Sequence, residues 1–127
     1  MQFAVDMLKV PHIVVCGHYG CSGGQAALRR DRLGLSDNWL RHVQDVREKH
    51  DTLLARTENG TDACILLCEL NVSAQVASVC QAKIAHAARE RDQPVSADCA
   101  CDAQYTVSTR GLRYHWDSGR VDHRTAT

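Results

Sequence analysis

The sequence is short of aromatic residues, prolines and net charge. It has one Phe, two Trp and three Tyr among its 127 residues, and only two Pro. Lys plus Arg and Asp plus Glu each number 15, so the formal net charge is zero. Nucleic-acid-binding proteins usually carry a basic excess. We therefore expect no nucleic-acid partner.

Membrane and export signals are also lacking. We see no continuous apolar run that is long enough to cross a bilayer. The first ten residues, MQFAVDMLKV, contain Asp6 and Lys9 and no cleavage site of a signal peptide. We expect a cytoplasmic protein that does not bind a membrane.

Cysteine, in contrast, is abundant. The chain has seven, an odd number that cannot all pair within one molecule. In a cytoplasmic protein thiols stay reduced, and they either pack as small apolar side chains or bind metals. A hydrophobic content of 44% and this length suit one core, so residues 1–127 are expected to form a single domain.

The first part of the chain has a helix–strand–turn–helix order. Apolar residues at helical spacing predict a helix over residues 2–9, which Pro11 ends. The run HIVVC is short and rich in β-branched residues, as is typical of a buried parallel strand. The glycine-rich turn GHYGCSGG and a helix that includes GQAALRR follow it. This order is typical of α/β folds.

Two longer helical regions follow. Residues 33–54 are expected to form the first, with Ser36 or Asp37 as its cap. The apolar positions expected to be buried there are Trp39, Leu40, Val43, Val46, Leu53 and Leu54. The second helix is expected to start at a cap on Thr61 or Asp62 and to run to about residue 91. Its expected buried positions are Ile65, Cys68, Val72, Val76, Val79 and Cys80.

Residues 95–127 are expected to form a tail of short strands and turns. The segment GLRYHWDSGRV is typical of a hairpin, with its turn at residues 117–119. Cys99 and Cys101 are two residues apart, so they share one face if their segment is a strand.

His18 and Cys21 are candidate zinc ligands in the glycine-rich turn. Zinc prefers imidazole and thiolate ligands, and only two residues separate this pair, so both can face one point. The turn follows a parallel strand, which is where open α/β sheets bind their ligands. The start of the next helix favours a thiolate at Cys21. A lone H-x-x-C pair is nevertheless a weak signal, and packing in a core is the competing interpretation.

The other features of this region have plainer interpretations. Cys16 ends the predicted strand and Cys80 lies on an apolar helix face, so both are expected in the core. Cys64 and Cys68 are one helical turn apart and could bind a metal, but a packed helix face explains them better. The glycine-rich turn could instead bind phosphate, although it matches neither G-x-x-x-x-G-K-[ST] nor G-x-G-x-x-G.

Three separated motifs add a family resemblance. AVDMLKVPHIVVCGHYGCSGGQAAL, LGLSDNWLRHVQDV and LCELNVSAQV follow one another between about residues 2 and 94. Together they closely resemble the β-class carbonic anhydrases. The resemblance implies that His18 and Cys21 bind Zn²⁺. It also implies a three-layer α/β fold with a short, mainly parallel sheet flanked by helices, and a homo-oligomer.

The activity implied by the resemblance is the reversible hydration of carbon dioxide to bicarbonate. In such sites zinc lowers the pKa of a bound water from about 15.7 to about 7, which makes hydroxide available at neutral pH. The hydroxide attacks carbon dioxide, and bicarbonate leaves. The implied substrates are therefore small molecules, carbon dioxide and bicarbonate.

One family motif has no counterpart here. The resemblance implies a third zinc ligand in a C-x-D-x-R motif, whose Asp and Arg act at the fourth zinc position. Asp45-Val46-Arg47 supplies only a D-x-R, because residue 43 is Val. We identify no catalytic residue and expect a truncated, C-terminal portion of the family's domain with a crippled site. The alternative is a non-catalytic homologue that acts as an interaction or structural module.

Overall fold

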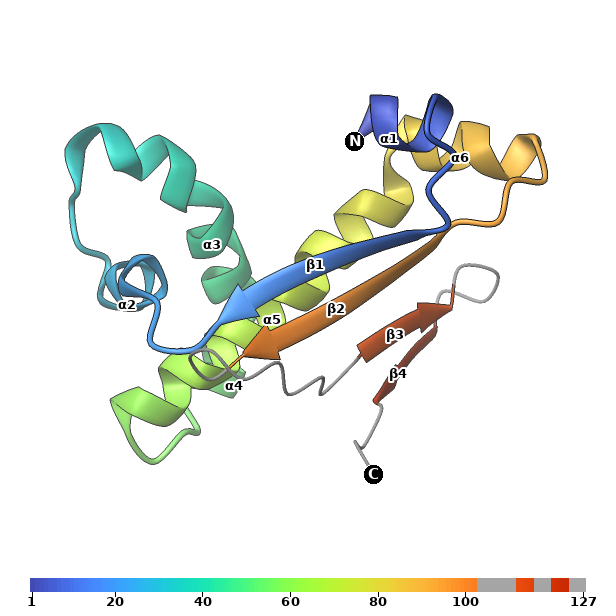
Figure 1. The fold of residues 1–127 in the computed structure, drawn as a ribbon. Coiled ribbons are helices and arrows are strands. Elements are labelled where there is room, and N and C mark those ends of the chain that lie inside the picture. The colour runs from blue at the N-terminus through green and yellow to red at the C-terminus, as the bar shows by residue number, and fades with distance from the viewer. Residues whose placement is uncertain (103–111, 116–119, 124–127) are drawn as a thin grey trace.

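The computed structural model of the chain describes residues 1–102, 112–115 and 120–123. Within these ranges the chain forms helices and four strands (Figure 1). In chain order the elements are α1 (Gln2–Asp6), β1 (His12–His18), α2 (Ser22–Arg29), the 3-10 helix η1 (Gly34–Ser36), α3 (Asp37–Lys49), α4 (Asp51–Leu54), α5 (Gly60–Gln81), α6 (Lys83–Glu90), β2 (Ser96–Asp102), β3 (Leu112–His115) and β4 (Arg120–His123).

The strands form one sheet in the order β1-β2-β3-β4. β1 and β2 are parallel, with His12 opposite Ser96 and His18 opposite Asp102. β3 and β4 extend the sheet in antiparallel fashion and form the hairpin predicted for the tail. The turn predicted at residues 117–119 lies outside the described residues. The expected α/β class is confirmed, and the parallel part of the described sheet is the short pair β1 and β2.

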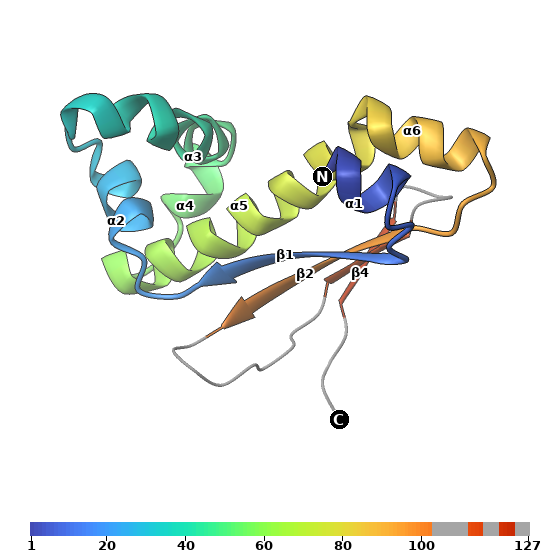
Figure 2. The same cartoon turned by 45° about the horizontal axis from the view of Figure 1, so that its top comes forward.

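The helices gather on one side of the parallel pair (Figure 2). α5 packs against both β1 and β2. α1 and α6 lie together, joined by an ion pair of 2.7 Å between Arg91 and Asp6. In the ranges that the structure describes, no helix covers the opposite face of β1. This part of the chain therefore presents two of the three layers that the sequence led us to expect.

β1 has one covered face and one open face. Its burial alternates along the strand, and the exposed positions are His12, Val14, Cys16 and His18. The half-buried positions, which face the helices, are Ile13, Val15 and Gly17. The prediction of a buried strand with Cys16 in the core is therefore wrong. An apolar run of this kind needs a layer on both faces to be buried, and only one is present here.

The ends of the helices differ from those predicted. Ser36 precedes α3, but its side chain makes no capping hydrogen bond. α5 is capped by Asn59, whose side-chain oxygen accepts a hydrogen bond from the Asp62 N–H at 2.8 Å. The single helix predicted to run to residue 91 is two helices, because Ala82 is extended (φ −64°, ψ 142°). Ala favours helices, so propensity gives no sign of this break.

The predicted core is correct for the residues that face α5 or the sheet. Fully buried as predicted are Leu40, Val46, Leu54, Val72, Val76 and Cys80. Three predicted core residues are exposed instead: Trp39 (68%), Leu53 (43%) and Ile65 (37%). The apolar arc of each helix is wider than the surface it packs against, and a helical wheel cannot show where that surface ends.

α5 is long and apolar enough, by length and composition, to cross a membrane. An 18-residue stretch within it has a mean hydropathy of 1.6, and 33% of that stretch is buried. This corrects the expectation that no such segment exists, because α5 is apolar on average although polar residues such as Glu69 interrupt its apolar runs. In this structure α5 packs against the sheet and against α2 and α3. A helix that is apolar on most sides is also typical of a protein core.

Candidate metal centre

The two predicted ligands lie at the end of the parallel pair. His18 is the last residue of β1, and Cys21 is the residue from which α2 starts. Between them Gly20 has a φ of +71°, a left-handed conformation that favours glycine. His18 is exposed, and its Nδ1 lies 3.3 Å from the carbonyl oxygen of Tyr19. The strand–turn–helix order thus places both residues at the C-terminal end of β1, where the sequence predicted a ligand site.

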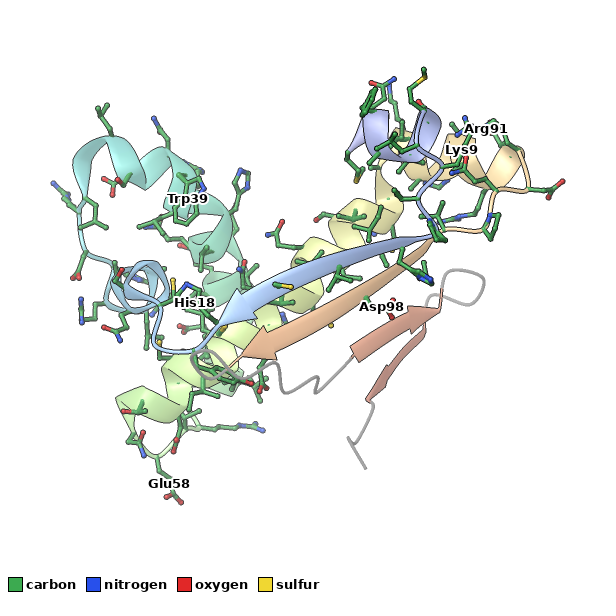
Figure 3. All side chains as sticks on the ribbon, in the orientation of Figure 1. Lys9, His18, Trp39, Glu58, Arg91 and Asp98 are labelled. Carbon is green, nitrogen blue, oxygen red and sulfur yellow. The ribbon has the colours of Figure 1, made fainter. Side chains whose placement is uncertain are left out.

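A cavity of about 220 Å³ lies beside this turn. It is bounded by β1, by the turn and by residues of α2, α3 and α5 (Figure 3). His18 and Cys21 line it, together with the exposed Trp39 of α3. Cys64 and Cys68 of α5 line it as well. The interpretation of these two cysteines as a packed helix face was therefore incomplete, because they face the cavity that contains the candidate ligands.

The thiols of α5 and β2 influence one another. A hydrogen bond from the Cys101 thiol lowers the pKa of Cys68, and the same bond raises the pKa of Cys101. Cys68 Sγ in turn donates to the carbonyl oxygen of His18 at 3.3 Å. Burial raises the pKa of Cys64, and the charge of Cys21 adds to this effect. The chain Cys101–Cys68–His18 connects β2 to the turn through α5.

Tyr19 and Glu69 form a second polar contact next to the turn. The Tyr19 hydroxyl donates to the Glu69 carboxylate at 2.7 Å. Burial, together with this bond to a carboxylate, raises the pKa of Tyr19. Sequence reasoning missed this pair, because its members lie 50 positions apart in the chain. The only available signal was that each adjoins a residue already under consideration, His18 and Cys68.

Gly17 allows β1 and α5 to approach closely. A Cβ at this position would overlap the Val72 side chain. It would also lie 3.2 Å from Cys68 Sγ and 3.7 Å from Cys101 Sγ. Val72 and Cys101 belong to the buried cluster between α5 and the sheet, and Cys68 packs against that cluster. The absence of a side chain at residue 17 is thus required by the packing.

The donor set suits zinc in kind but not in number. The imidazole of His18 and the thiol of Cys21 are groups that zinc prefers. A zinc site needs at least three protein ligands. In residues 1–102 and the two described strand segments after them, no three His, Cys, Asp or Glu side chains group closely enough to hold a metal ion. A complete metal site is therefore not present in this part of the chain.

A parallel strand pair that ends in an H-x-x-C turn indicates an α/β protein with a candidate zinc site. Comparison with known proteins identifies the family. The family model described as carbonic anhydrase matches residues 1–119. A carbonic anhydrase of Emericella nidulans is 40% identical over 92 residues, which are 72% of this chain.

Two solved structures agree in fold. A tetrameric β-carbonic anhydrase of Sordaria macrospora matches with a TM-score of 0.71 and 27% identity, covering 96% of this chain and 56% of its own. A Coccomyxa β-carbonic anhydrase, solved in complex with acetazolamide, matches with a TM-score of 0.72 and 32% identity, covering 96% of this chain and 50% of its own. This chain belongs to the carbonic anhydrase family, in its β class.

The chain spans only part of its relatives. It covers 40% of the length of the Emericella nidulans protein and about half of the two solved chains. The family match also reaches residue 119, further than the motifs between residues 2 and 94 that first indicated it. The tail that contains β2 and β3 therefore belongs to the family's domain as well.

Proposed function

We propose that this chain supplies part of the zinc site of a carbonic anhydrase that interconverts carbon dioxide and bicarbonate. His18 and Cys21 are the two ligands. The observation that carries the proposal is the place of both residues on a cavity at the C-terminal edge of the parallel strands. When bound, zinc would supply a water of lowered pKa. The donor set of the described residues is partial, so we assign no catalytic step to them.

The lining of the cavity supports a small apolar substrate. Val15, Leu40, Leu67 and Val72 contribute side chains to it. Carbon dioxide is neutral and apolar, and such a surface would hold it without the cost of desolvating a charge. His18 and Cys21 line the same cavity, so a zinc ion bound by them would lie next to the carbon dioxide.

We propose that the chain alone binds zinc weakly. Complete structural sites are worth about 10–16 kcal/mol, and two ligands fall far short of a complete set. The test is the zinc content after dialysis against a mild chelator. We expect substoichiometric zinc that falls further in His18→Ala and Cys21→Ala. The matched control is His86→Ala, on the exposed side of α6, which should equal the parent chain. Stoichiometric zinc that survives Cys21→Ala contradicts the assignment.

We also propose that the isolated chain hydrates carbon dioxide poorly, because the C-x-D-x-R motif is absent from its sequence. Stopped-flow hydration with the zinc-loaded chain measures this directly. The expected rate is close to the uncatalysed one. Robust turnover that disappears in His18→Ala but persists in His86→Ala would show a complete site, and the proposal of a crippled one would fail.

Self-association is the third part of the proposal. Within the described residues β1 is paired on one side only, by β2, and its other edge has unpaired backbone groups. Such edges invite pairing with another chain. The similar Sordaria macrospora protein is described as tetrameric. We expect a dimer or larger species by sedimentation at micromolar concentration, shifted toward monomer by Val14→Lys. A clean monomer of the parent chain contradicts this.

A non-catalytic role is the second candidate function. The missing C-x-D-x-R motif favours it, since a chain that keeps the fold without the motif could serve as an interaction or structural module. The hydration assay separates the two functions when it is repeated at increasing chain concentration. Activity that rises more steeply than concentration supports a site completed between chains. Absence of activity at every concentration, together with a zinc content that neither His18→Ala nor Cys21→Ala changes, supports the module.

A further inference from the structure

Two cysteines outside the predicted ligand pair lie together under β1. Cys68 is on α5, and Cys101 is on β2, opposite Gly17 in the parallel register. The point where a Gly17 Cβ would lie is 3.2 Å from one sulfur and 3.7 Å from the other, so both sulfurs occupy the space that this glycine leaves open. The Cys101 thiol hydrogen-bonds to Cys68.

We propose that Cys68 and Cys101 are a redox-active thiol pair, which a hydroperoxide oxidises to an intramolecular disulfide between α5 and β2. To form it, the two hydrogen-bonded sulfurs must approach each other to an S–S distance of about 2.05 Å. The pair consists of residues other than the candidate ligands His18 and Cys21, although Cys68 lines the same cavity. It does not depend on zinc or on the proposed carbonic anhydrase activity.

The cavity decides which sulfur reacts first. Cys68 lines it, whereas Cys101 is only 9% exposed and is not among the lining residues. A small peroxide can therefore reach Cys68 from the cavity, while Cys101 is reached through Cys68. This is the arrangement of an attacking thiol and a resolving thiol.

The chemistry balances with the peroxide as the only oxidant. The Cys68 thiolate attacks one peroxide oxygen, an S–O bond forms, the O–O bond breaks and hydroxide leaves. Cys101 sulfur then attacks the sulfenic acid sulfur, the S–S bond forms and the S–O bond breaks. The departing hydroxide takes up the Cys101 proton as water, and the first hydroxide takes up the proton that Cys68 had released. Two thiols are oxidised by two electrons, and hydrogen peroxide is reduced to two waters.

Oxidation would also alter the candidate metal centre. Cys68 Sγ donates to the His18 carbonyl oxygen at 3.3 Å, and a disulfide sulfur has no proton to donate. The end of β1 would lose this contact with α5. The redox state of the thiol pair can therefore affect the H-x-x-C turn through this hydrogen bond.

The test is hydrogen peroxide treatment of the reduced 127-residue chain. After quenching, the chain is unfolded and alkylated, and its mass and cross-links are measured. We expect a monomer with two fewer alkylated thiols than the chain's seven and a loss of about 2 Da before alkylation. Fragmentation should join Cys68 to Cys101, and dithiothreitol should reverse the change.

Four variants sharpen the result. Cys68→Ala and Cys101→Ala should each abolish the cross-link. The matched controls, Cys64→Ala on the same helix and Cys99→Ala on the same strand, should keep it. If a variant fails to fold, the cross-links measured in the chain without substitutions still test the proposal. A dominant bond between Cys21 and Cys64, a link between two chains, or sulfinic acid at Cys68 without a cross-link would each overturn the proposal.

Discussion

The two faces of β1 are built from the same strand but behave differently. On the inner face Val15 and Gly17 lie against α5, and residues of the tail complete a buried cluster around them. On the outer face Val14 is 57% exposed and His18 ends the strand in the open. The inner face has the contacts that hold the fold, whereas the outer face has little packing. Substitutions on the two faces should therefore have unequal effects.

The largest effect is expected at Gly17. Gly17→Ala places a methyl group against Val72, which is 3% exposed and would have to shift within the core. We expect a loss of about 3 kcal/mol in the free energy of unfolding, measured by urea denaturation. Gly24→Ala is the matched control, because its Cβ would meet only Cys21 Cβ at 3.8 Å within α2. It should be neutral or stabilising by up to about 1 kcal/mol. Equal losses at both sites would remove the argument for close packing at Gly17.

A pair of identical substitutions compares the faces directly. Val15→Thr puts a hydroxyl beside the buried cluster and should cost about 1–2 kcal/mol. Val14→Thr makes the same change on the exposed face and should stay within about 0.5 kcal/mol of the parent. Both keep a β-branched side chain, so strand propensity cancels. If Val14→Thr costs as much as Val15→Thr, the outer face of β1 is covered in solution, as self-association through it would require.

Tyr19, the residue after β1, packs against the same buried cluster as Val15. Tyr19→Phe removes its hydrogen bond to Glu69 and should cost about 1 kcal/mol at neutral pH. Because the folded pKa of Tyr19 is raised, the unfolded chain releases this proton first, near pH 10. The contribution of Tyr19 is complete below about pH 10 and is lost as the pH rises toward the folded pKa. Urea denaturation at neutral pH and at about pH 10.5 should show a smaller decline for Tyr19→Phe than for the parent. Parallel declines would contradict the raised pKa.

The smallest effect is expected on the outer face at Cys16. Its side chain is exposed, so Cys16→Ser should change the free energy of unfolding by less than about 0.5 kcal/mol. Thermal denaturation is sufficient to measure this. A loss above about 1 kcal/mol would restore the original interpretation of Cys16 as a core residue.

Local signals in the sequence predicted several elements of the fold. The strand HIVVC, the glycine-rich turn and the hairpin near the end of the chain all depend on neighbouring residues, and the structure contains each of them. β2 was less evident. Its sequence, SADCACD, is built of Ala, Asp, Ser and Cys, and several of these residues are depleted in strands. It is a strand because β1 and β3 pair with it, and this cannot be seen in its own residues.

The candidate site was predictable in part for the same reason. His18 and Cys21 are close in sequence, and a single tight turn places both. Cys64 and Cys68 reach the cavity only because α5 packs behind β1, and the spacing of two cysteines along a helix is the same whether they pack or bind. The exposure of Trp39 is likewise decided by what lies beyond α3. Tertiary contacts of this kind have no local signature in the sequence.

The parallel register of β1 and β2 also bears on how the chain is made. His12 pairs with Ser96, 84 positions later, so the sheet cannot close until nearly the whole described chain is present. At about 5–20 residues per second, a ribosome needs roughly 4–17 s to add the intervening residues. Throughout that interval β1 lacks its partner β2, and an unpaired β-branched edge is prone to aggregation and to binding by chaperones. The order of the elements thus makes the synthesis of β2 the step that pairs one edge of β1.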